Sequence, residues 1–193
     1  MYSKMLAAVR FDNNQDIDLL LAQFAAMQIG QGTRVRGVLQ SRGSQTGECN
    51  CRDMDLRVIG AVQKFRISQS LGNGSSGCRL HSGKLVECSA FLDQQLEQGC
   101  DLLVLNRFGK GESDGHGFRD LINKAIAMDV PVLLAVRPTY VESWNAYVGN
   151  CAEILSPDIQ CLEEWFEGLK NEVGERTEAN EHGQHCLLGR KIA

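Results

Sequence analysis

Residues 101–122 read DLLVLNRFGKGESDGHGFRDLI: an apolar run, a glycine-containing loop and the start of a helix. The run over residues 101–105 is almost entirely apolar, which is typical of a strand in the middle of a parallel sheet. A second run of this kind, VLLAV at residues 132–136, follows the helical segment. Strands that alternate with helices indicate a three-layer α/β domain with a mainly parallel sheet.

The same alternation extends along the chain in both directions. Apolar spacing predicts helices over residues 16–29, 84–98, 117–128 and 140–148, and further strands over residues 5–10, 34–40 and 152–155. Residues 54–67 favour a hairpin near Gly60, and a last helix is predicted from Pro157 to Val173 with Ser156 as its N-cap. We therefore expect one α/β domain over residues 1–173 and a polar tail over residues 174–193.

Charge and hydropathy exclude several classes of protein. The 193 residues include 20 Lys and Arg against 24 Asp and Glu, a net charge of −4, which excludes a basic protein that coats nucleic acid. No apolar run approaches the roughly 20 residues of a membrane span, and the amino terminus lacks the pattern of a secretory signal. We expect a cytoplasmic protein that binds neither nucleic acid nor membrane.

Hydrogen-bond donors gather where the predicted strands end. In open α/β sheets, ligands bind beyond the carboxyl ends of the strands. Five donor residues are predicted to lie there: Arg10, Asn106, Arg107, Lys110 and Arg137. The irregular segment 68–83 adds Ser75, Ser76, Gly77 and Arg79, with backbone N–H groups that can form an anion-binding nest. Together these donors suit a small anion of multiple charge, although each could also be a solvated surface residue or part of a flexible connection.

Glu112 is the carboxylate in this group of donors. We expect it to form a salt bridge that orients Arg107 and Lys110, because a carboxylate that faced the anion would repel it. The alternatives are a catalytic acid or base and a simple loop charge.

The turn after the first strand lacks the residues of a nucleotide phosphate site. Residues 11–16 (FDNNQD) contain no glycine, lysine or hydroxyl, all of which a phosphate-binding P-loop requires. Asp16 and Asp18 place negative charge in the first helical turn, which opposes a bound phosphate. Asn106 and Arg107 also stand where a nucleotide hydrolase needs acids. We expect no bound nucleotide.

Seven of the eight cysteines fall into two groups, and the eighth, Cys186, lies in the polar tail. In the first, Cys49, Cys51, Cys78 and His81 lie in two predicted loops and could hold zinc if those loops meet. Otherwise they are loop thiols, and soft thiolates also bind molybdenum or tungsten. The second group lies on or beside apolar periodic positions and is predicted to fill the core: Cys88, Cys100, Cys151 and Cys161.

Four segments carry a resemblance to known proteins. ISQSLGNGSSGCRLHSG (67–83) and the segment 101–122, with MLAAVRFD (5–12) and PVLLAVRPTYVESW (131–144), resemble a bacterial family of uncharacterised proteins encoded beside molybdate-transport genes. Segment 101–122 is more distantly similar to the THEP-type P-loop nucleoside triphosphatases. Asn106 and Arg107 occupy the place of that family's Asp–Glu pair, whereas Gly109 and Glu112 match it. The resemblance implies a degenerate P-loop NTPase-like fold without nucleotide machinery.

The genes beside that family imply which anion is bound. The resemblance points to molybdate or tungstate, and so to a non-catalytic oxyanion-binding protein in molybdenum or tungsten homeostasis. Its partners would be a second copy of the chain or another protein of the molybdenum pathway. A divergent nucleotide hydrolase or phosphotransferase that uses Glu112, and a regulatory interaction module with a vestigial pocket, are the alternatives.

Overall fold

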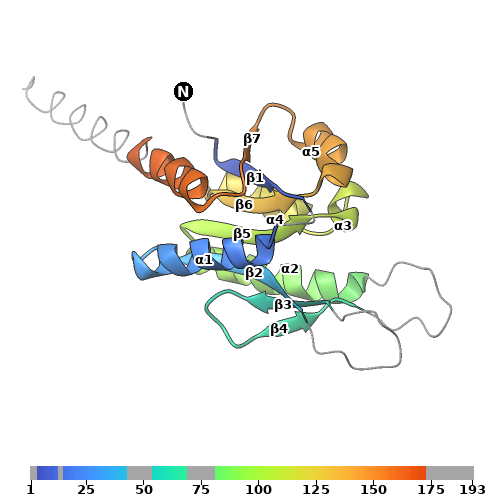
Figure 1. The fold of residues 1–193 in the computed structure, drawn as a ribbon. Helices are drawn as coiled ribbons and strands as arrows, with labels where there is room; N and C mark the ends of the chain where they lie inside the picture. Colours follow the sequence, from blue (N-terminus) through green and yellow to red (C-terminus); the bar gives the residue numbers. More distant parts are fainter. Residues whose placement is uncertain (1–3, 13–14, 43–53, 69–80, 173–193) are drawn as a thin grey trace, which may run out of the picture.

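The computed structural model describes residues 4–12, 15–42, 54–68 and 81–172. Seven strands form one sheet in the order β4-β3-β2-β5-β6-β1-β7 (Figure 1). Five are parallel: β2 (Val35–Arg42), β5 (Leu102–Phe108), β6 (Val132–Val136), β1 (Leu6–Arg10) and β7 (Ala152–Leu155). The hairpin strands β3 (Met54–Val58) and β4 (Lys64–Arg66) extend the sheet antiparallel. The predicted mainly parallel α/β fold is confirmed.

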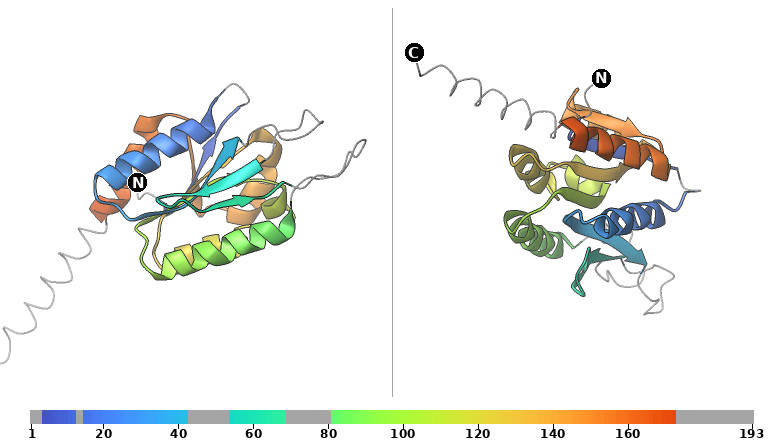
Figure 2. Two further views of the ribbon diagram at one scale, coloured as in Figure 1. Left: turned by 90° about the horizontal axis from the view of Figure 1, so that it is seen from below. Right: turned by 90° about the vertical axis from the view of Figure 1, so that its left-hand side faces the viewer.

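Helices cover both faces of this sheet (Figure 2). One face carries α1 (Ile17–Gly30) and a C-terminal helix over residues 159–172. The other carries α2 (Ser82–Glu97), α4 (Arg119–Ala127) and α5 (Val141–Val148). Two short elements lie at the ends of strands, α3 (Lys110–Ser113) after β5 and the 3-10 helix η1 (Pro138–Tyr140) after β6.

The sheet separates two hydrophobic cores. Ala7 and Val9 of β1 face the core beneath α1, whereas Leu6 and Ala8 face the core beneath α2 and α4. Strands buried on both faces need near-continuous apolar runs, which explains why the central strands were readable from sequence. Across the first core, α1 and the C-terminal helix meet through two phenylalanine rings in edge-to-face contact, with centroids 6.3 Å apart.

The sheet splits between β2 and β5. Residues Val35–Gly37 pair in parallel with β5, and the residues from Val38 onward pair with β3. The register of β5 shifts between Val104 and Arg107. Gly37 stands at the branch with φ +133°, and a Cβ there would collide with the carbonyl of Val104. Only glycine fits this close approach, which fixes where the two strands diverge.

The strand predicted over residues 101–105 is longer than its apolar run. It continues as β5 to Phe108, so Asn106 and Arg107 lie within the strand and not after it. The strand tolerates these polar residues because each has a polar partner: Asn106 bonds to Gln40 of β2, and Arg107 bonds to Asp18.

The last helix begins at residue 159, and the prediction that it starts at Pro157 with a Ser156 cap is wrong. The Ser156 carbonyl accepts a hydrogen bond from the Asp158 N–H at 2.8 Å, which forms a tight turn before the helix. The Asp158 carboxylate then accepts from the Gln160 N–H at 3.1 Å. Asp158 therefore supplies the side chain that bonds the first helical turn.

The described residues leave some predictions outside the structure. Most of the irregular segment, residues 69–80, and the tail from residue 173 onward lie outside them. Within the described ranges, no helix has the length and apolar character to cross a bilayer.

Candidate anion-binding site

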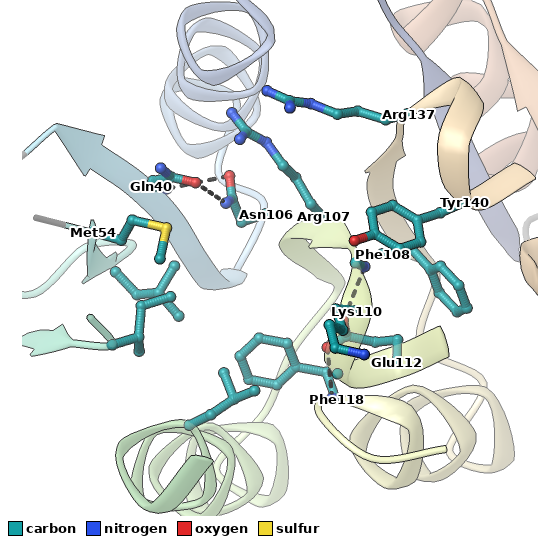
Figure 3. Close-up of a pocket in the computed structure, with 15 residues that line it drawn as sticks. Gln40, Met54, Asn106, Arg107, Phe108, Lys110, Glu112, Phe118, Arg137 and Tyr140 are labelled. Carbon is teal, nitrogen blue, oxygen red and sulfur yellow. Dashed lines mark hydrogen bonds between the residues drawn. The ribbon is translucent and has the colours of Figure 1, made fainter. Parts of the chain in front are cut away.

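A pocket with a volume of about 260 Å³ lies beside the carboxyl ends of β2, β5 and β6 (Figure 3). Five residues singled out from the sequence line it: Asn106, Arg107, Lys110, Glu112 and Arg137. They come from β5, α3 and the residue after β6, segments brought together by parallel pairing. The strand-end rule therefore located this cavity.

Asn106 bridges the split in the sheet. Its side chain is buried, and its Nδ2 donates a hydrogen bond to Gln40 Oε1 at 3.0 Å. The Gln40 backbone N–H donates in return to Asn106 Oδ1 at 3.3 Å. This pair of bonds replaces the backbone ladder that β2 and β5 have lost here. Asn106 was predicted as a ligand donor, and in the structure its amide connects the two walls of the pocket.

Arg107 and Arg137 converge on one aromatic ring. Their Cζ atoms lie 5.3 and 5.5 Å from the ring centroid of Phe11, which is buried. Both side chains extend alongside each other towards α1 (Figure 3). Cation–π contact with Phe11 partly stabilises each guanidinium, but two like charges held close together still repel. A nearby anion lowers that repulsion.

Asp18 supplies negative charge beside these arginines. Its Oδ1 accepts from Arg107 at 2.7 Å, and the two side chains are 18% and 22% exposed. Asp16, the N-cap of α1, accepts from the Leu19 N–H at 3.2 Å. Both acids were predicted to lie in the first turn of this helix; Asp18 does, Asp16 precedes it as the N-cap, and the sequence did not identify Asp18 as the partner of Arg107. The sequence signal was limited to the prediction that the strand before this helix and the strand of Arg107 belong to the same parallel sheet, in which β6 separates them.

Glu112 does not have its expected role of orienting Arg107 and Lys110 by a salt bridge. It is 5% exposed, and its two oxygens accept hydrogen bonds from the Gly109 and Phe118 backbone N–H groups, each at 3.0 Å. The first bond is the return half of a capping box at the start of α3. Burial favours this arrangement because a carboxylate removed from water needs a donor for each oxygen.

The cations near Glu112 find other acids, and glycine makes room for the carboxylate. Arg107 pairs with Asp18, and Lys110 Nζ pairs with Asp114 at 2.9 Å. Gly117 has φ +66°, and a Cβ there would collide with Glu112 Oε1. The loop from α3 to α4 thus wraps closely around the carboxylate.

The remainder of the pocket lining is largely apolar. These side chains come from β3, the residue after β4, α2 and the N-cap of α4, and nothing in the sequence indicated that they would adjoin the cations: Met54, Leu56, Ile67, Leu85 and Phe118. Their apolar periodicity predicts that they form the buried faces of strands and helices, and in the structure they also belong to the hydrophobic core. The site therefore has a cationic side next to β5 and β6 and an apolar side next to the hairpin.

The structure does not bring all predicted donors into this pocket. Arg10 is exposed at the end of β1 and is not among the lining residues. Ser75, Ser76, Gly77 and Arg79 lie outside the described residues, so their predicted roles are untested.

Of the predicted zinc ligands, only His81 lies in the described part of the chain. It is the N-cap of α2, and its Nδ1 accepts from the Lys84 N–H at 3.3 Å. Cys49, Cys51 and Cys78 lie outside the described residues. Among the residues that can be placed, no group of three or more His, Cys, Asp or Glu side chains could hold a metal ion.

The remaining cysteines divide between core and surface. Cys88 and Cys100 are buried as predicted, and burial raises their thiol pKa values to about 12 and about 11. Cys151 is exposed and Cys161 is intermediate, so the prediction that Cys151 fills the core is wrong. Cys151 lies in the turn after Gly149, which has φ +55° and ends α5, and this turn carries the thiol to the surface.

Comparisons with known proteins place the fold and the family. "Molybdenum import ATP-binding protein ModC 2" of Bradyrhizobium diazoefficiens is 31% identical over 161 residues, which span 83% of this chain but only 18% of that protein. The solution structure of a human cancer-related nucleoside triphosphatase aligns with a TM-score of 0.56 at 12% identity, over 87% of this chain and 95% of the other. That likeness shows a P-loop NTPase-like fold. A family model described as "Protein of unknown function (DUF2478)" matches residues 6–165, and the chain therefore belongs to the DUF2478 family.

Proposed function

We propose that this protein is a non-catalytic module that binds molybdate or tungstate in the handling of molybdenum or tungsten. The observation that carries the proposal is the convergence of Arg107 and Arg137 on Phe11, beside a pocket that Lys110 also lines. At neutral pH these oxyanions are tetrahedral dianions that offer only hydrogen-bond acceptors. Guanidinium groups present several donors in a fixed fork and retain their charge, so they suit such a ligand.

The choice of anion draws on the relative from Bradyrhizobium. That protein is named for molybdenum import, and the chain matches less than a fifth of it. The shared segment favours molybdate and tungstate over other tetrahedral anions as the first ligands to test. We further propose a cytoplasmic location, with a second copy or a protein of the molybdenum pathway as partner. Zinc at Cys49, Cys51, Cys78 and His81 stays a prediction, as does direct thiolate binding of molybdenum or tungsten.

The absence of catalysis is proposed from the chemistry of the residues at the strand ends. The turn at residues 11–16 lacks the glycine, lysine and hydroxyl of a P-loop. Asn106 and Arg107 stand on β5 where metal-binding acids would be needed. Both oxygens of Glu112 already accept backbone hydrogen bonds. A general base in this pocket would have to give up one of those bonds.

A divergent nucleotide hydrolase or phosphotransferase is the second candidate. The observation that favours it is the fold shared with a nucleoside triphosphatase, of which the alignment covers 95%. Fold alone does not carry an activity, because the same architecture serves many functions. A regulatory interaction module with a vestigial pocket is the third reading.

Calorimetric titration at fixed ionic strength separates these candidates. The ligands are molybdate, tungstate, sulfate, phosphate and ATP with magnesium, and single-site binding of the first two is expected. Arg137→Ala should weaken molybdate binding about tenfold or more, because loss of a charge-assisted contact costs about 1.5 kcal/mol.

Arg10→Ala is the matched control. It removes an exposed arginine from the neighbouring strand end, outside the pocket lining, and should change affinity less than twofold. Binding and turnover of ATP would instead support the hydrolase. No response to any of the five ligands would refute the proposal and favour the interaction module.

A further inference from the structure

The Arg107–Asp18 pair leaves part of the guanidinium unused. The terminal Nη2 of Arg107 donates to Asp18 Oδ1 at 2.7 Å, while its Nε is buried and has no hydrogen-bond partner. An arginine that meets a carboxylate in the forked geometry would engage two donors at once. A buried donor without a partner carries a desolvation cost that a ligand could relieve.

The charges beside Phe11 also fail to cancel. Arg107 and Arg137 contribute two positive charges, and Asp18 contributes one negative charge. Among the described residues, no carboxylate forms a salt bridge with Arg137, whose side chain is exposed. These three side chains together carry a net charge of +1. Asp18 pairs with Arg107, which is the more buried of the two arginines.

Asp18 is placed so that it can leave Arg107. It lies in the first turn of α1, and its side chain is 18% exposed. The hydrogen bond to Arg107 connects it to β5, which lines the pocket. Capping of the helix does not depend on it, because Asp16 performs that task. Rotation of the Asp18 side chain towards solvent would therefore free a guanidinium without unwinding the helix.

We infer that Asp18 is an internal competitor for the oxyanion: it holds Arg107 while the site is empty and is displaced when the ligand binds. The inference rests on the proposed function and adds a residue that sets its affinity. An incoming dianion that bridges Arg107 and Arg137 supplies acceptor oxygens to both arginines. Asp18 supplies one oxygen, and only to Arg107. Asp18 thereby limits the affinity and excludes anions that interact too weakly to replace it.

Asp18→Asn, a nearly isosteric change that removes the charge, tests this role. We expect it to tighten tungstate binding about tenfold in calorimetric titration, because the ligand no longer has to break a partly exposed ion pair. Asp18→Glu, which keeps the charge, should bind within about threefold of the wild type. Asp16→Asn is the matched control: it removes a charge from the same helix end, keeps a good N-cap residue and should change affinity less than twofold.

Thermal unfolding separates displacement from simple repulsion. If the ion pair exists only in the empty protein, Asp18→Asn lowers Tm by about 3–6 °C without ligand, which is the free energy of the tenfold gain in affinity, and leaves Tm unchanged in saturating tungstate. If Asp18 merely repels a ligand that binds beside it, the empty proteins have the same Tm and the saturated variant is the more stable. The second pattern overturns the inference.

The titration also distinguishes failure of the inference from failure of the proposed function. If wild-type protein binds tungstate but Asp18→Asn has the same affinity as Asp16→Asn, the competitor role is wrong and oxyanion binding stands. If neither wild-type protein nor Asp18→Asn binds tungstate or molybdate, the proposed function fails, and the competitor role fails with it.

Discussion

Replacement of Glu112 by glutamine should destabilise the fold although the shape hardly changes. Both carboxylate oxygens accept backbone N–H groups at 3.0 Å in a side chain that is 5% exposed. A glutamine offers one oxygen, so its NH₂ group must face one of the two donors. Two charge-assisted bonds of about 1.5–3 kcal/mol each are then replaced by one neutral bond of about 1 kcal/mol. The expected loss is about 3 kcal/mol, or roughly 6–12 °C in Tm for a chain of this size.

Urea unfolding, followed by tryptophan fluorescence, measures this loss. Trp144 and Trp165 are buried and lie in the two different cores, so both report on global unfolding. Glu87→Gln is the control, because this exposed glutamate on α2 forms only a surface ion pair and should cost less than about 0.5 kcal/mol. If Glu112→Gln unfolds at the same urea concentration as the control, the two backbone bonds do not hold the loop in the way described.

Two further predictions concern the branch in the sheet and the buried thiols. Gly37→Ala places a methyl group against a backbone carbonyl of β5 and should lower the free energy of unfolding in urea by more than about 3 kcal/mol. Gly30→Ala is the control, because this glycine has open space around it and the change should be nearly neutral. Equal stability of the two variants would contradict the geometry of the branch. Because burial raises the pKa of Cys88 to about 12, this residue should remain unmodified by iodoacetamide in folded protein up to about pH 10, while exposed Cys151 is labelled at pH 8. Site-resolved mass spectrometry measures the extent of labelling at the two cysteines. Rapid labelling of Cys88 in protein that stays folded would refute the burial argument.

The layer order and most elements were predictable because apolar periodicity reports burial directly. β6 is a continuous apolar run, and it is buried on both faces as such a run requires. The end of β5 was not predictable, since Asn106 and Arg107 look like loop residues. Their place in the strand depends on the amide of Gln40, which lies 66 residues away in the chain and meets Asn106 only after folding.

The candidate site was predictable as a location but not as a set of contacts. The strand-end rule placed Arg107, Lys110 and Arg137 together, because parallel strands end at the same edge of a sheet. It could not pair Arg107 with Asp18, 89 residues away. Nor could it show that Glu112 would bond to backbone N–H groups, because that choice depends on the path of the loop and on the left-handed Gly117.

The branch at Gly37 also divides the molecule mechanically. Within the sheet, the outer part of β2 and the β3–β4 hairpin join the central strands through a three-residue ladder and the Gln40–Asn106 amides. Outside the sheet, the hairpin is held by its apolar packing on α2, where the rings of Phe65 and Phe91 are 5.8 Å apart. Segments with few cross-links open at a lower free energy than the whole molecule. Native-state hydrogen exchange should therefore show that the backbone amides of β3 and β4 exchange through a local opening of lower free energy than global unfolding. Such a protein can unpair the strands at one edge of its sheet while the central parallel strands keep their hydrogen bonds.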